Sequence, residues 1–416
     1  MFLYDQVDER PAGLYPAESE PSGQAQRLAC ALVTEWPEVE RLAPTWSALL
    51  ERSYNNHPML SPAWLLPWWR IYGDGRALRV GLFHDGDRLV GLAPLHRRRV
   101  WARRCLPFRR LEQLGADVAE GDGVGSEYLG VLAERGSEAA VAQAVVTAIT
   151  AGRFGPLDEV VLPVMAGDRP LPSLLTSAFA RAGFHAECAT TGACPNIPLP
   201  TSWDEYLAAL SGNARYFVRR SLRDFEKWAG GPPLVRRATT AAELAEGTRI
   251  LKSLHGDRWA KASQSGVFYA PRFAAFHDAV MPDLLRQGAL QLWWLMAHGE
   301  PIAALYNIVW DGRVLVYQSG RKPDTPPGIR PGIVLHALAI RAAVEAGQRE
   351  YDFLGGEAQY KSQMSLASRP LVQVRAARRC LVEAGRRLIE GTIALTRPAR
   401  RTADLVWQRL RNRAAN

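Results

Sequence analysis

The sequence predicts an α+β protein made of two similar modules, each a mixed, mainly antiparallel sheet flanked by helices. Three observations lead to this fold class. Alternating apolar runs joined by Asp-Gly or His-Gly turns occur at 78–95 and again at 290–308, the pattern of antiparallel hairpins. In both places a further strand, an apolar helix and a buried strand come next in the same order. A length of 416 residues favours two or three domains.

The most informative stretch runs from residue 290 to residue 361. Its strands are expected at LQLWWLM (290–296), PIAALYNI (301–308) and RVLVYQSG (313–320), because β-branched and aromatic residues are enriched there. A Pro- and Gly-rich loop (323–332) then leads into an apolar helix that ends near Gly347. The run YDFL has the composition of a short buried strand.

The first half of the chain repeats this order. Strands are expected at 78–84, 88–95, 126–132 and 158–165, with a helix from 137 to 151 before the last of them. A repeated order of elements indicates internal duplication. The halves differ in two ways. The first has HRRRVWARRCLPFRR (96–110), predicted to be an Arg-rich loop, and it has no counterpart to the Pro-Gly pair before the helix of the second.

Turn and cap residues divide the chain into four parts. Residues 1–27 are predicted to be a disordered or loosely packed lead-in, because they combine Pro, Gly and acids with few large apolar groups. The first module is expected at 28–195 and the second at 196–370, with the candidate active site in the second. Residues 371–416 are predicted to form a basic, amphipathic helical tail.

Within the first module, Ser61 and Pro62 form a cap and first-turn pair before a helix rich in Trp, and these Trp residues are predicted to pack in the core or at a domain interface. The second module begins with a capped helix at 201–210 and a longer helix that ends at two glycines. On the longer helix, four cations at intervals of four form either a solvated face or a ridge that binds anions. These cations are Arg215, Arg219, Arg223 and Lys227.

Residues 243–285 are predicted to be helices joined by a loop. His255, Arg258 and Trp259 lie in this region together with Asp257. Charged and aromatic side chains in a loop are either an acceptor pocket or a helix end that packs a Trp.

Charge and hydropathy exclude several classes of protein. No apolar run is long enough for a transmembrane helix, and the acidic, Pro-broken start is unlike a signal peptide. The formal charge of +9 comes mainly from residues 371–416, where eleven arginines face three acids. The five cysteines lack paired spacing, which is typical of reduced thiols in a cytosolic protein, and no His or acidic cluster accompanies them to form a metal site.

Four segments of the chain carry a likeness to a known family. LHGDRW (254–259), GEPIAAL (299–305), the helix led by Pro331-Gly332, and YDFLGGEAQYK (351–361) resemble the CelD/BcsL-type acetyltransferases of cellulose and exopolysaccharide biosynthesis. That family belongs to the GNAT superfamily and has distant relatives among the Fem-type aminoacyl transferases. The resemblance implies tandem GNAT-like domains, acetyl-CoA or another acyl-CoA as co-substrate with no tightly bound cofactor, and acyl transfer to an amine or hydroxyl.

The donor site is predicted where strand 313–320 and the next helix meet. A helix N-terminus has free N–H groups and partial positive charge, which suit a pyrophosphate. The loop after Arg321 departs from the superfamily's usual pattern Q/R-x-x-G-x-G/A, so the prediction depends on the resemblance and on the Pro-Gly turn. The predicted donor residues are Tyr317, Gln318, Gly328, Arg330, Pro331 and Gly332.

Acyl transfer from a thioester needs an acceptor nucleophile, a route for its proton and donors for the developing oxyanion. No Ser-His-Asp or Cys-His pattern is present, so direct attack in a ternary complex is expected. The candidate catalytic groups are Asp352, Glu357, Tyr360 and Lys361, with Glu357 as a general base and Lys361, one of only five lysines, as an oxyanion or phosphate ligand. Each of these residues is also a candidate for a structural role.

The expected partner is a small-molecule or saccharide acceptor. The candidate acceptor residues are His255, Arg258, Trp259, Arg219 and Arg223. The basic tail is predicted either to lie on an anionic membrane or to pack on the domain. The chain is expected in the cytoplasm, and in the first case it would associate peripherally with the inner face of the plasma membrane. No nucleic-acid fold signature accompanies the arginines, so nucleic acid is not the expected partner. Two other functions stay open: aminoacyl transfer from charged tRNA, and a non-catalytic accessory role in polysaccharide synthesis.

Overall fold

The computed structural model describes residues 27–102, 106–116, 122–261, 266–356, 358–380 and 383–387. The predicted lead-in (1–27) lies almost entirely outside these ranges, as does the tail from 388 on. Among the described residues, no helix is both long enough and apolar enough to cross a membrane.

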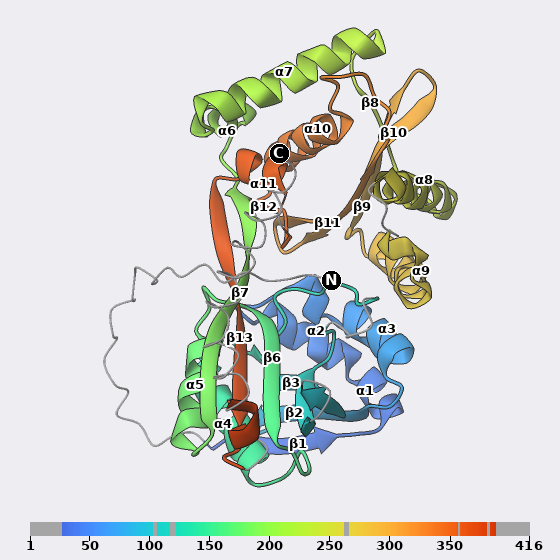
Figure 1. The fold of residues 1–416 in the computed structure, drawn as a ribbon. Coiled ribbons are helices and arrows are strands. Elements are labelled where there is room, and N and C mark those ends of the chain that lie inside the picture. The colour runs from blue at the N-terminus through green and yellow to red at the C-terminus, as the bar shows by residue number, and fades with distance from the viewer. Residues whose placement is uncertain are drawn as a thin grey trace, which may run out of the picture.

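Two modules with the same order of elements make up the molecule (Figure 1). The first contains β1 (Ala29–Val33), α1 (Trp36–Arg41), α2 (Ala43–Glu51), η1 (Pro58–Leu60), α3 (Pro62–Tyr72), β2 (Ala77–Asp85), β3 (Arg88–Ala102), β4 (Leu106–Gln113), β5 (Leu132–Ala133), α4 (Glu138–Thr150), β6 (Glu159–Ala166), α5 (Leu171–Arg181) and β7 (His185–Pro198). The second contains α6 (Trp203–Ala209), α7 (Gly212–Ala229), β8 (Leu234–Arg237), α8 (Ala241–Lys261), η2 (Val267–Tyr269), α9 (Pro271–Arg286), β9 (Leu290–Ala297), β10 (Glu300–Trp310), β11 (Arg313–Arg321), α10 (Pro331–Glu345), β12 (Glu350–Asp352), α11 (Gln359–Met364) and β13 (Ala367–Ala377).

The strands of the described residues form one continuous sheet in the order β1-β2-β3-β4-β6-β13-β7-β12-β11-β10-β9-β8, with β5 beside β3. Each half has one parallel pair, β4 with β6 and β11 with β12, and the other neighbours are antiparallel. The predicted fold class, an α+β protein with tandem, mainly antiparallel modules, is therefore confirmed, and the two sheets are joined edge to edge.

The modules exchange their last strands. Strand β7 leaves the first module and pairs with β12 of the second, while β13 leaves the second and pairs with β6 of the first. The two exchanged strands pair with each other from Ala367–Asn196 to Ala377–His185. Figure 1 shows them running between the modules.

This exchange corrects the predicted domain boundaries. The boundary at 195/196 falls inside β7, and the tail predicted from 371 starts too early, because 367–377 is a strand in the middle of the sheet. The segment LVQVRAA (371–377) is a strand because its apolar residues are buried where it pairs with β6 and β7. Its arginine does not indicate an exposed basic tail, because Arg375 is buried in ion pairs with Glu159 and Glu383.

The Arg-rich segment 96–110 is also different from its prediction. Most of it belongs to β3 and β4, which form a hairpin from Leu95–Gln113 to Ala102–Leu106. Strand β4 thus occupies the place after the β2–β3 hairpin where the strand 126–132 was expected, and of that expected strand only Leu132 is in β5. The charges are tolerated in a strand because Arg98 pairs with Glu112, and Arg110 with Glu159.

The tight hairpin turns of the second module agree with the prediction. His298 and Gly299 have φ angles of 51° and 79°, and Asp311 and Gly312 have 47° and 68°. Two consecutive positive φ angles are what a two-residue type I′ hairpin requires, and Gly and Asp adopt them at low cost.

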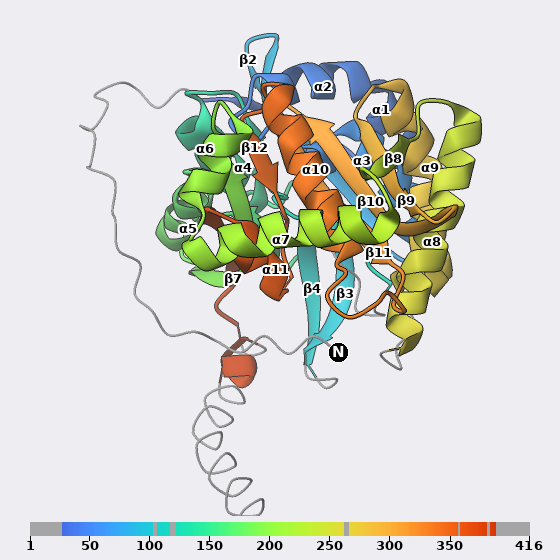
Figure 2. The ribbon, with the colours of Figure 1, turned by 90° about the horizontal axis from the view of Figure 1, so that it is seen from above.

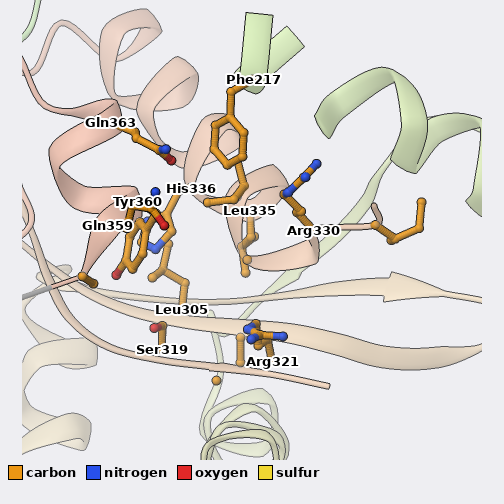
Figure 3. Close-up of a pocket in the computed structure, with 16 residues that line it drawn as sticks. Phe217, Leu305, Ser319, Arg321, Arg330, Leu335, His336, Gln359, Tyr360 and Gln363 are labelled. Carbon is orange, nitrogen blue, oxygen red and sulfur yellow. The ribbon is translucent and has the colours of Figure 1, made fainter. Parts of the chain in front are cut away.

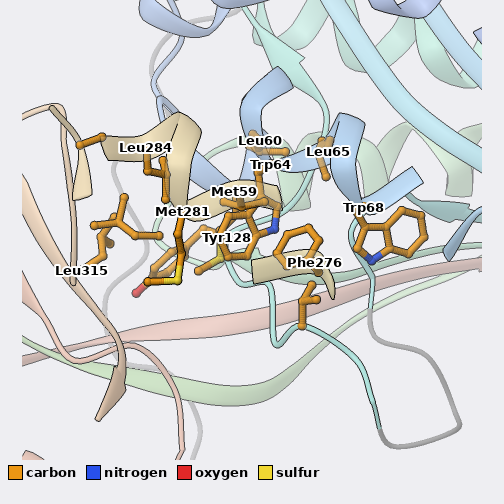
Figure 4. Close-up of a cluster of buried hydrophobic side chains, with 14 of the residues drawn as sticks. Met59, Leu60, Trp64, Leu65, Trp68, Tyr128, Phe276, Met281, Leu284 and Leu315 are labelled. Carbon is orange, nitrogen blue, oxygen red and sulfur yellow. The ribbon is translucent and has the colours of Figure 1, made fainter. Parts of the chain in front are cut away.

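One hydrophobic cluster spans both modules (Figure 4). The ring of Trp64 on α3 meets Phe276 on α9 edge to face, with centroids 4.8 Å apart, and both are buried. Leu315 of β11 and Tyr128 of the first module belong to the same cluster. The predicted role of the Trp residues of α3 as core packing is confirmed for Trp64 and Trp68, which are almost fully buried. Because burial of apolar area stabilises their contact, the modules are held together by more than their shared strands.

A buried charge cluster lies at the strand exchange. Arg369 of β13 donates hydrogen bonds to Glu350 and Asp352 of β12 and to Asp168 of the first module, at 2.8–3.2 Å. Asp352 is completely buried and also accepts from the Tyr128 hydroxyl. Arg369 therefore compensates carboxylates that would otherwise be buried without a cation.

Replacement of Arg369 by Ala should lower the free energy of unfolding by about 3–5 kcal/mol, because it leaves Glu350 and Asp352 without their cation. Chemical denaturation followed by circular dichroism measures this change. The matched control is Arg341→Ala, which removes an exposed pair with Glu345 on α10 and should cost less than about 0.5 kcal/mol. Equal effects of the two substitutions would contradict the assigned role of Arg369.

Candidate active site

Strands β11 and β12 separate soon after they pair. They are hydrogen-bonded only from Arg313–Glu350 to Leu315–Asp352, whereas β11 continues to Arg321. A register shift in the pairing of β11 with β10 lies in the same place, where Asn307 pairs with Val316 and Tyr306 with Gln318. Residue 317 is therefore the extra residue of a β-bulge, and a bulge bends its strand and redirects the side chains beyond it.

Helix α10 begins beside the separated end of β11. Pro331 and Gly332 occupy its first turn, and no side chain caps this end. The first N–H groups of a helix have no intrahelical acceptor, so this end has free donors and a partial positive charge. The prediction that Pro331 starts a helix is confirmed.

A pocket of about 730 Å³ lies between these elements (Figure 3). Its size is typical of small-molecule sites. β10 and β11 form one side, and α7, α10 and α11 contribute the others. The lining residues are Phe217, Ala304, Leu305, Ser319, Gly320, Arg321, Ile329, Arg330, Gly332, Ile333, Leu335, His336, Ala358, Gln359, Tyr360 and Gln363.

Among the lining residues that the structure describes, the charged side chains are those of Arg321 and Arg330, and both are positive. The Arg330 guanidinium lies 5.1 Å from the centre of the Phe217 ring, a cation–π contact that orients it. Two guanidinium groups beside an uncapped helix N-terminus form a site for phosphate-type anions.

The other end of the pocket has two stacked rings, those of His336 and Tyr360, whose centroids are 5.0 Å apart. Nδ1 of His336 is 3.0 Å from the Tyr351 hydroxyl. Burial, assisted by the nearby Lys361 cation, lowers the pKa of His336 to about 3. The imidazole is therefore neutral at physiological pH, and it stacks on the Tyr360 ring.

Of the predicted donor residues, Arg330 and Gly332 line the pocket. Pro331, between them, is the first residue of α10. Gly328 belongs to the preceding loop, where its carbonyl accepts from Arg330. Tyr317 and Gln318 do not line the pocket. The Tyr317 hydroxyl instead contacts His277 at 2.9 Å and donates to Val124, so this side chain belongs to the contact between the modules.

The predicted catalytic residues separate into two places. Tyr360 lines the pocket, but Asp352 does not: it lies in the charge cluster, where burial raises its pKa to about 7 against opposing hydrogen bonds from Leu354 and Tyr128. Lys361 donates to the carbonyl oxygens of Leu354 and Gly355 and thereby holds the segment after β12. Glu357 lies outside the described residues.

Two of the predicted acceptor residues, Arg219 and Arg223, do not line the pocket. Arg219 and Arg223 are exposed on α7, and Arg219 is about 200° around the helix from Phe217. Arg215 of the same face donates to the carbonyls of Ala208 and Leu210. These contacts favour the solvated-face alternative for the cationic row.

His255 lies on α8, and its backbone packs directly against Gly320 of β11, while its ring is buried against Phe268. Arg258 and Trp259 also belong to α8, so the expected loop is helix here, and their side chains lie outside the described part of the chain.

Sequence reasoning missed several lining residues. Arg321 and Ser319 lie beyond the bulge, which cannot be read from residue types, and Phe217 comes from a helix about 100 positions earlier. His336 had a signal: it is a single imidazole inside the apolar helix IVLHALAI (333–340). For Gln359 and Gln363 the sequence contained no signal except that they follow the YDFL segment closely.

The corresponding helix of the first module, α4, begins with a different charge. Glu138 lies in its first turn, and the Glu138 carboxylate accepts from the Gly136 N–H at 3.0 Å. A buried carboxylate at a helix N-terminus disfavours the binding of an anion there. The first turn of α10 contains Pro331 and Gly332 instead, so the two helix starts differ in charge.

No group of three or more His, Cys, Asp or Glu side chains within the described ranges is arranged to bind a metal ion.

Comparison with known proteins identifies the domain that contains the pocket. Residues 212–362 match the model of the Acetyltransferase (GNAT) domain family Acetyltransf_6. This range runs from α7 to α11 and includes all the lining residues except Gln363. The described lining of the pocket therefore lies almost entirely in the segment that is similar to this GNAT acetyltransferase domain family. No curated protein matches the chain.

Solved structures with a similar fold include FemX, with a TM-score of 0.54 and 10% identity over 79% of this chain and 95% of that one. Others are L-PGS from Bacillus licheniformis (TM-score 0.47, 15% identity, 86% and 98%) and a tandem GNAT protein from the clavulanic acid biosynthesis pathway (TM-score 0.41, 11% identity, 83% and 98%). At 10% identity, the likeness to FemX concerns the fold.

Replacement of two glycines of the pocket by Ala should have different effects on stability. A Cβ on Gly320 would lie 2.7 Å from the backbone nitrogen of His255 and 2.8 Å from the carbonyl carbon of Leu254, so Gly320→Ala must separate β11 from α8. It should cost about 1–3 kcal/mol of stability. A Cβ on Gly332 has only the Arg321 Cδ at 3.7 Å, so Gly332→Ala is the matched control and should leave thermal stability unchanged or slightly raised. Tolerance of Ala at residue 320 would contradict this packing of the strand.

Proposed function

We propose that the second module binds an acyl-CoA in the pocket, with its pyrophosphate at the N-terminus of α10, and transfers the acyl group to an amine or hydroxyl. The observation that carries this proposal is the combination of an uncapped helix end with Arg321 and Arg330, the charged residues of the described lining. A donor with two linked phosphates and a long uncharged arm fits a pocket with a cationic end and a largely uncharged remainder.

The separation of β11 and β12 supports the same assignment. Strand β11 continues to Arg321, whereas its pairing with β12 ends at Leu315, so an extended ligand with amide groups could pair with this edge of β11 as a strand would. The thioester would then lie near α11, where Tyr360 is.

The reaction is a direct displacement. The acceptor nitrogen or oxygen forms a bond to the thioester carbonyl carbon, the carbon–sulfur bond breaks, and the leaving thiolate takes a proton. Tyr360 is the proton donor in this proposal, because its phenol lines the pocket. The acceptor loses its proton to a general base, for which Glu357 remains the prediction.

The acceptor is proposed to be a sugar or another cell-envelope or exopolysaccharide precursor at the cytoplasmic face of the membrane. This part depends on the resemblance to the CelD/BcsL-type acetyltransferases. The basic tail, most of which is outside the described residues, would keep the enzyme near such precursors.

Aminoacyl transfer from charged tRNA is the second candidate, favoured by the FemX-like fold. A transfer assay with labelled aminoacyl-tRNA separates it from the first. Aminoacyl transfer together with no binding of any acyl-CoA would replace the proposal. No turnover with either donor, and an unchanged phenotype for pocket variants, would support the accessory role.

Single substitutions Arg321→Ala and Arg330→Ala should each weaken binding of acetyl-CoA by about tenfold or more, because a charge-assisted hydrogen bond contributes about 1.5–3 kcal/mol. Isothermal titration calorimetry with acetyl-CoA and longer acyl-CoAs measures this. Arg219→Ala, an exposed arginine on the far side of α7, is the control and should bind normally. No binding of any acyl-CoA by the unmodified protein would refute the donor assignment.

Tyr360→Phe keeps the ring stack on His336 and removes the proton donor. It should lower kcat by about 10²–10⁴ while donor affinity is unchanged. Release of free thiol with amino sugars as acceptors is a suitable assay. The loss should become smaller with acyl thioesters of more acidic thiols, which leave without protonation. Tyr216→Phe, at an exposed tyrosine of α7, is the matched control. A loss independent of the leaving thiol would show that Tyr360 acts only through packing.

A further inference from the structure

The β3–β4 hairpin extends beyond the rest of the sheet. Pairing of β2 with β3 ends at Arg97, and pairing of β6 with β4 begins at Arg110. Between these points β3 and β4 have only each other as strand neighbours, down to the pair Ala102–Leu106. The turn of the hairpin, residues 103–105, lies outside the described residues.

Side chains alternate between the two faces of this ribbon. On one face, Arg99 lies opposite Arg109, and Trp101 lies opposite Pro107 nearer the tip. All four are exposed, and Trp101 is 64% exposed. Among the tryptophans whose side chains the structure describes, Trp101 is the one that belongs to the exposed class. An exposed indole costs solvation energy unless a partner covers it.

The opposite face of the ribbon is already occupied. Phe108 is 1% exposed, and Leu106 lies near Gly385 of the C-terminal segment, 3.9 Å from the position of a Cβ there. The guanidinium groups of Arg98 and Arg110 are held by Glu112 and Glu159. The ribbon is thus fixed to the module by one face, and the face with Trp101 is left open.

More positive charge lies beside the base of the ribbon. Arg378 donates its N–H to the Asp158 carbonyl, and the Asp158 side chain accepts from Arg109, which brings the C-terminal segment next to β4. Arg379 and Arg387 of that segment are exposed. Figure 2 shows the hairpin and the described end of the chain projecting from the same side of the molecule.

We infer that the exposed face of the β3–β4 hairpin docks on a membrane surface rich in anionic phospholipid, independently of the donor pocket. Trp101 enters the interfacial region, and Arg99, Arg379 and Arg387 face the lipid phosphates. An amphipathic ring at an extremity with cations behind it matches this interface, because indoles favour the headgroup level and each arginine near the surface contributes about 1 kcal/mol.

Two other partners fit the surface less well. Single-stranded nucleic acid is bound by rows of aromatic side chains on which successive bases stack, and this face has one such ring. A stable protein interface needs a broad area, on the order of 800 Å² on each partner, whereas the open face is a narrow two-stranded ribbon.

Flotation of the full chain with vesicles tests the inference. The chain should float with vesicles of phosphatidylcholine and phosphatidylglycerol at 3:1 and remain behind with phosphatidylcholine alone. Trp101→Ala should weaken the apparent affinity at least about fivefold, from the lost apolar burial of one ring. Arg99→Gln should weaken it about fivefold, and its effect should disappear in high salt.

Tyr54→Ala is the matched control, because Tyr54 is a 51% exposed aromatic residue of the same module beside Arg135. It should float like the unmodified chain. Unchanged flotation of both Trp101→Ala and Arg99→Gln would overturn the inference and leave the tail as the sole membrane contact. Binding of a single-stranded RNA oligonucleotide that Trp101→Ala abolishes, with vesicle binding intact, would overturn it in favour of nucleic acid. Far-ultraviolet circular dichroism checks that each variant is folded.

Discussion

The antiparallel pairing of β7 with β13 is the contact on which the rest of the structure depends. Each strand is the last of its module and has left that module for the other, so neither half-sheet is complete without the opposite end of the chain. The pair spans residues separated by almost 200 positions, and closing such loops costs conformational entropy that local contacts do not repay. The apolar cluster around Trp64 and Phe276 and the ion pairs of Arg369 provide compensation at the same junction.

This junction also shapes the pocket. Strand β12 is only three residues long, because β7 takes its other edge and the chain then turns at Leu354 and Gly355 toward α11. Strand β11 consequently continues without a parallel neighbour, and the space between β11 and α11 is open to a ligand. Asp352 and Lys361, two of the predicted catalytic residues, hold this turn: Asp352 accepts from the Leu354 N–H, and Lys361 donates to the carbonyl oxygens of Leu354 and Gly355. Both side chains therefore help to position the segment that leads to α11.

Duplication allowed the two halves to specialise. The second module has two arginines beside the N-terminus of α10, whereas the first turn of the corresponding helix, α4, contains the buried Glu138. The first module has a long β3–β4 ribbon with the exposed Trp101 near its end. One half therefore has the features of a donor site and the other those of a docking surface, and the shared sheet holds them in a fixed relation.

The hairpins of the second module, the duplication and the helix start at Pro331 could be predicted from the sequence alone. They are set by φ preferences and apolar periodicity, which operate over a few residues. Tertiary structure decided what depends on distant partners. The strand 367–377 looked like the start of a basic tail because its partners, β6 and β7, lie far back in the chain, and ion pairs with Glu159 and Glu383 hide the charge of Arg375. Likewise, because of the bulge opposite Tyr306 and Asn307, Ser319 and Arg321 line the pocket and Tyr317 contacts the first module. Register is a property of two paired strands, so it cannot be predicted from the sequence of one.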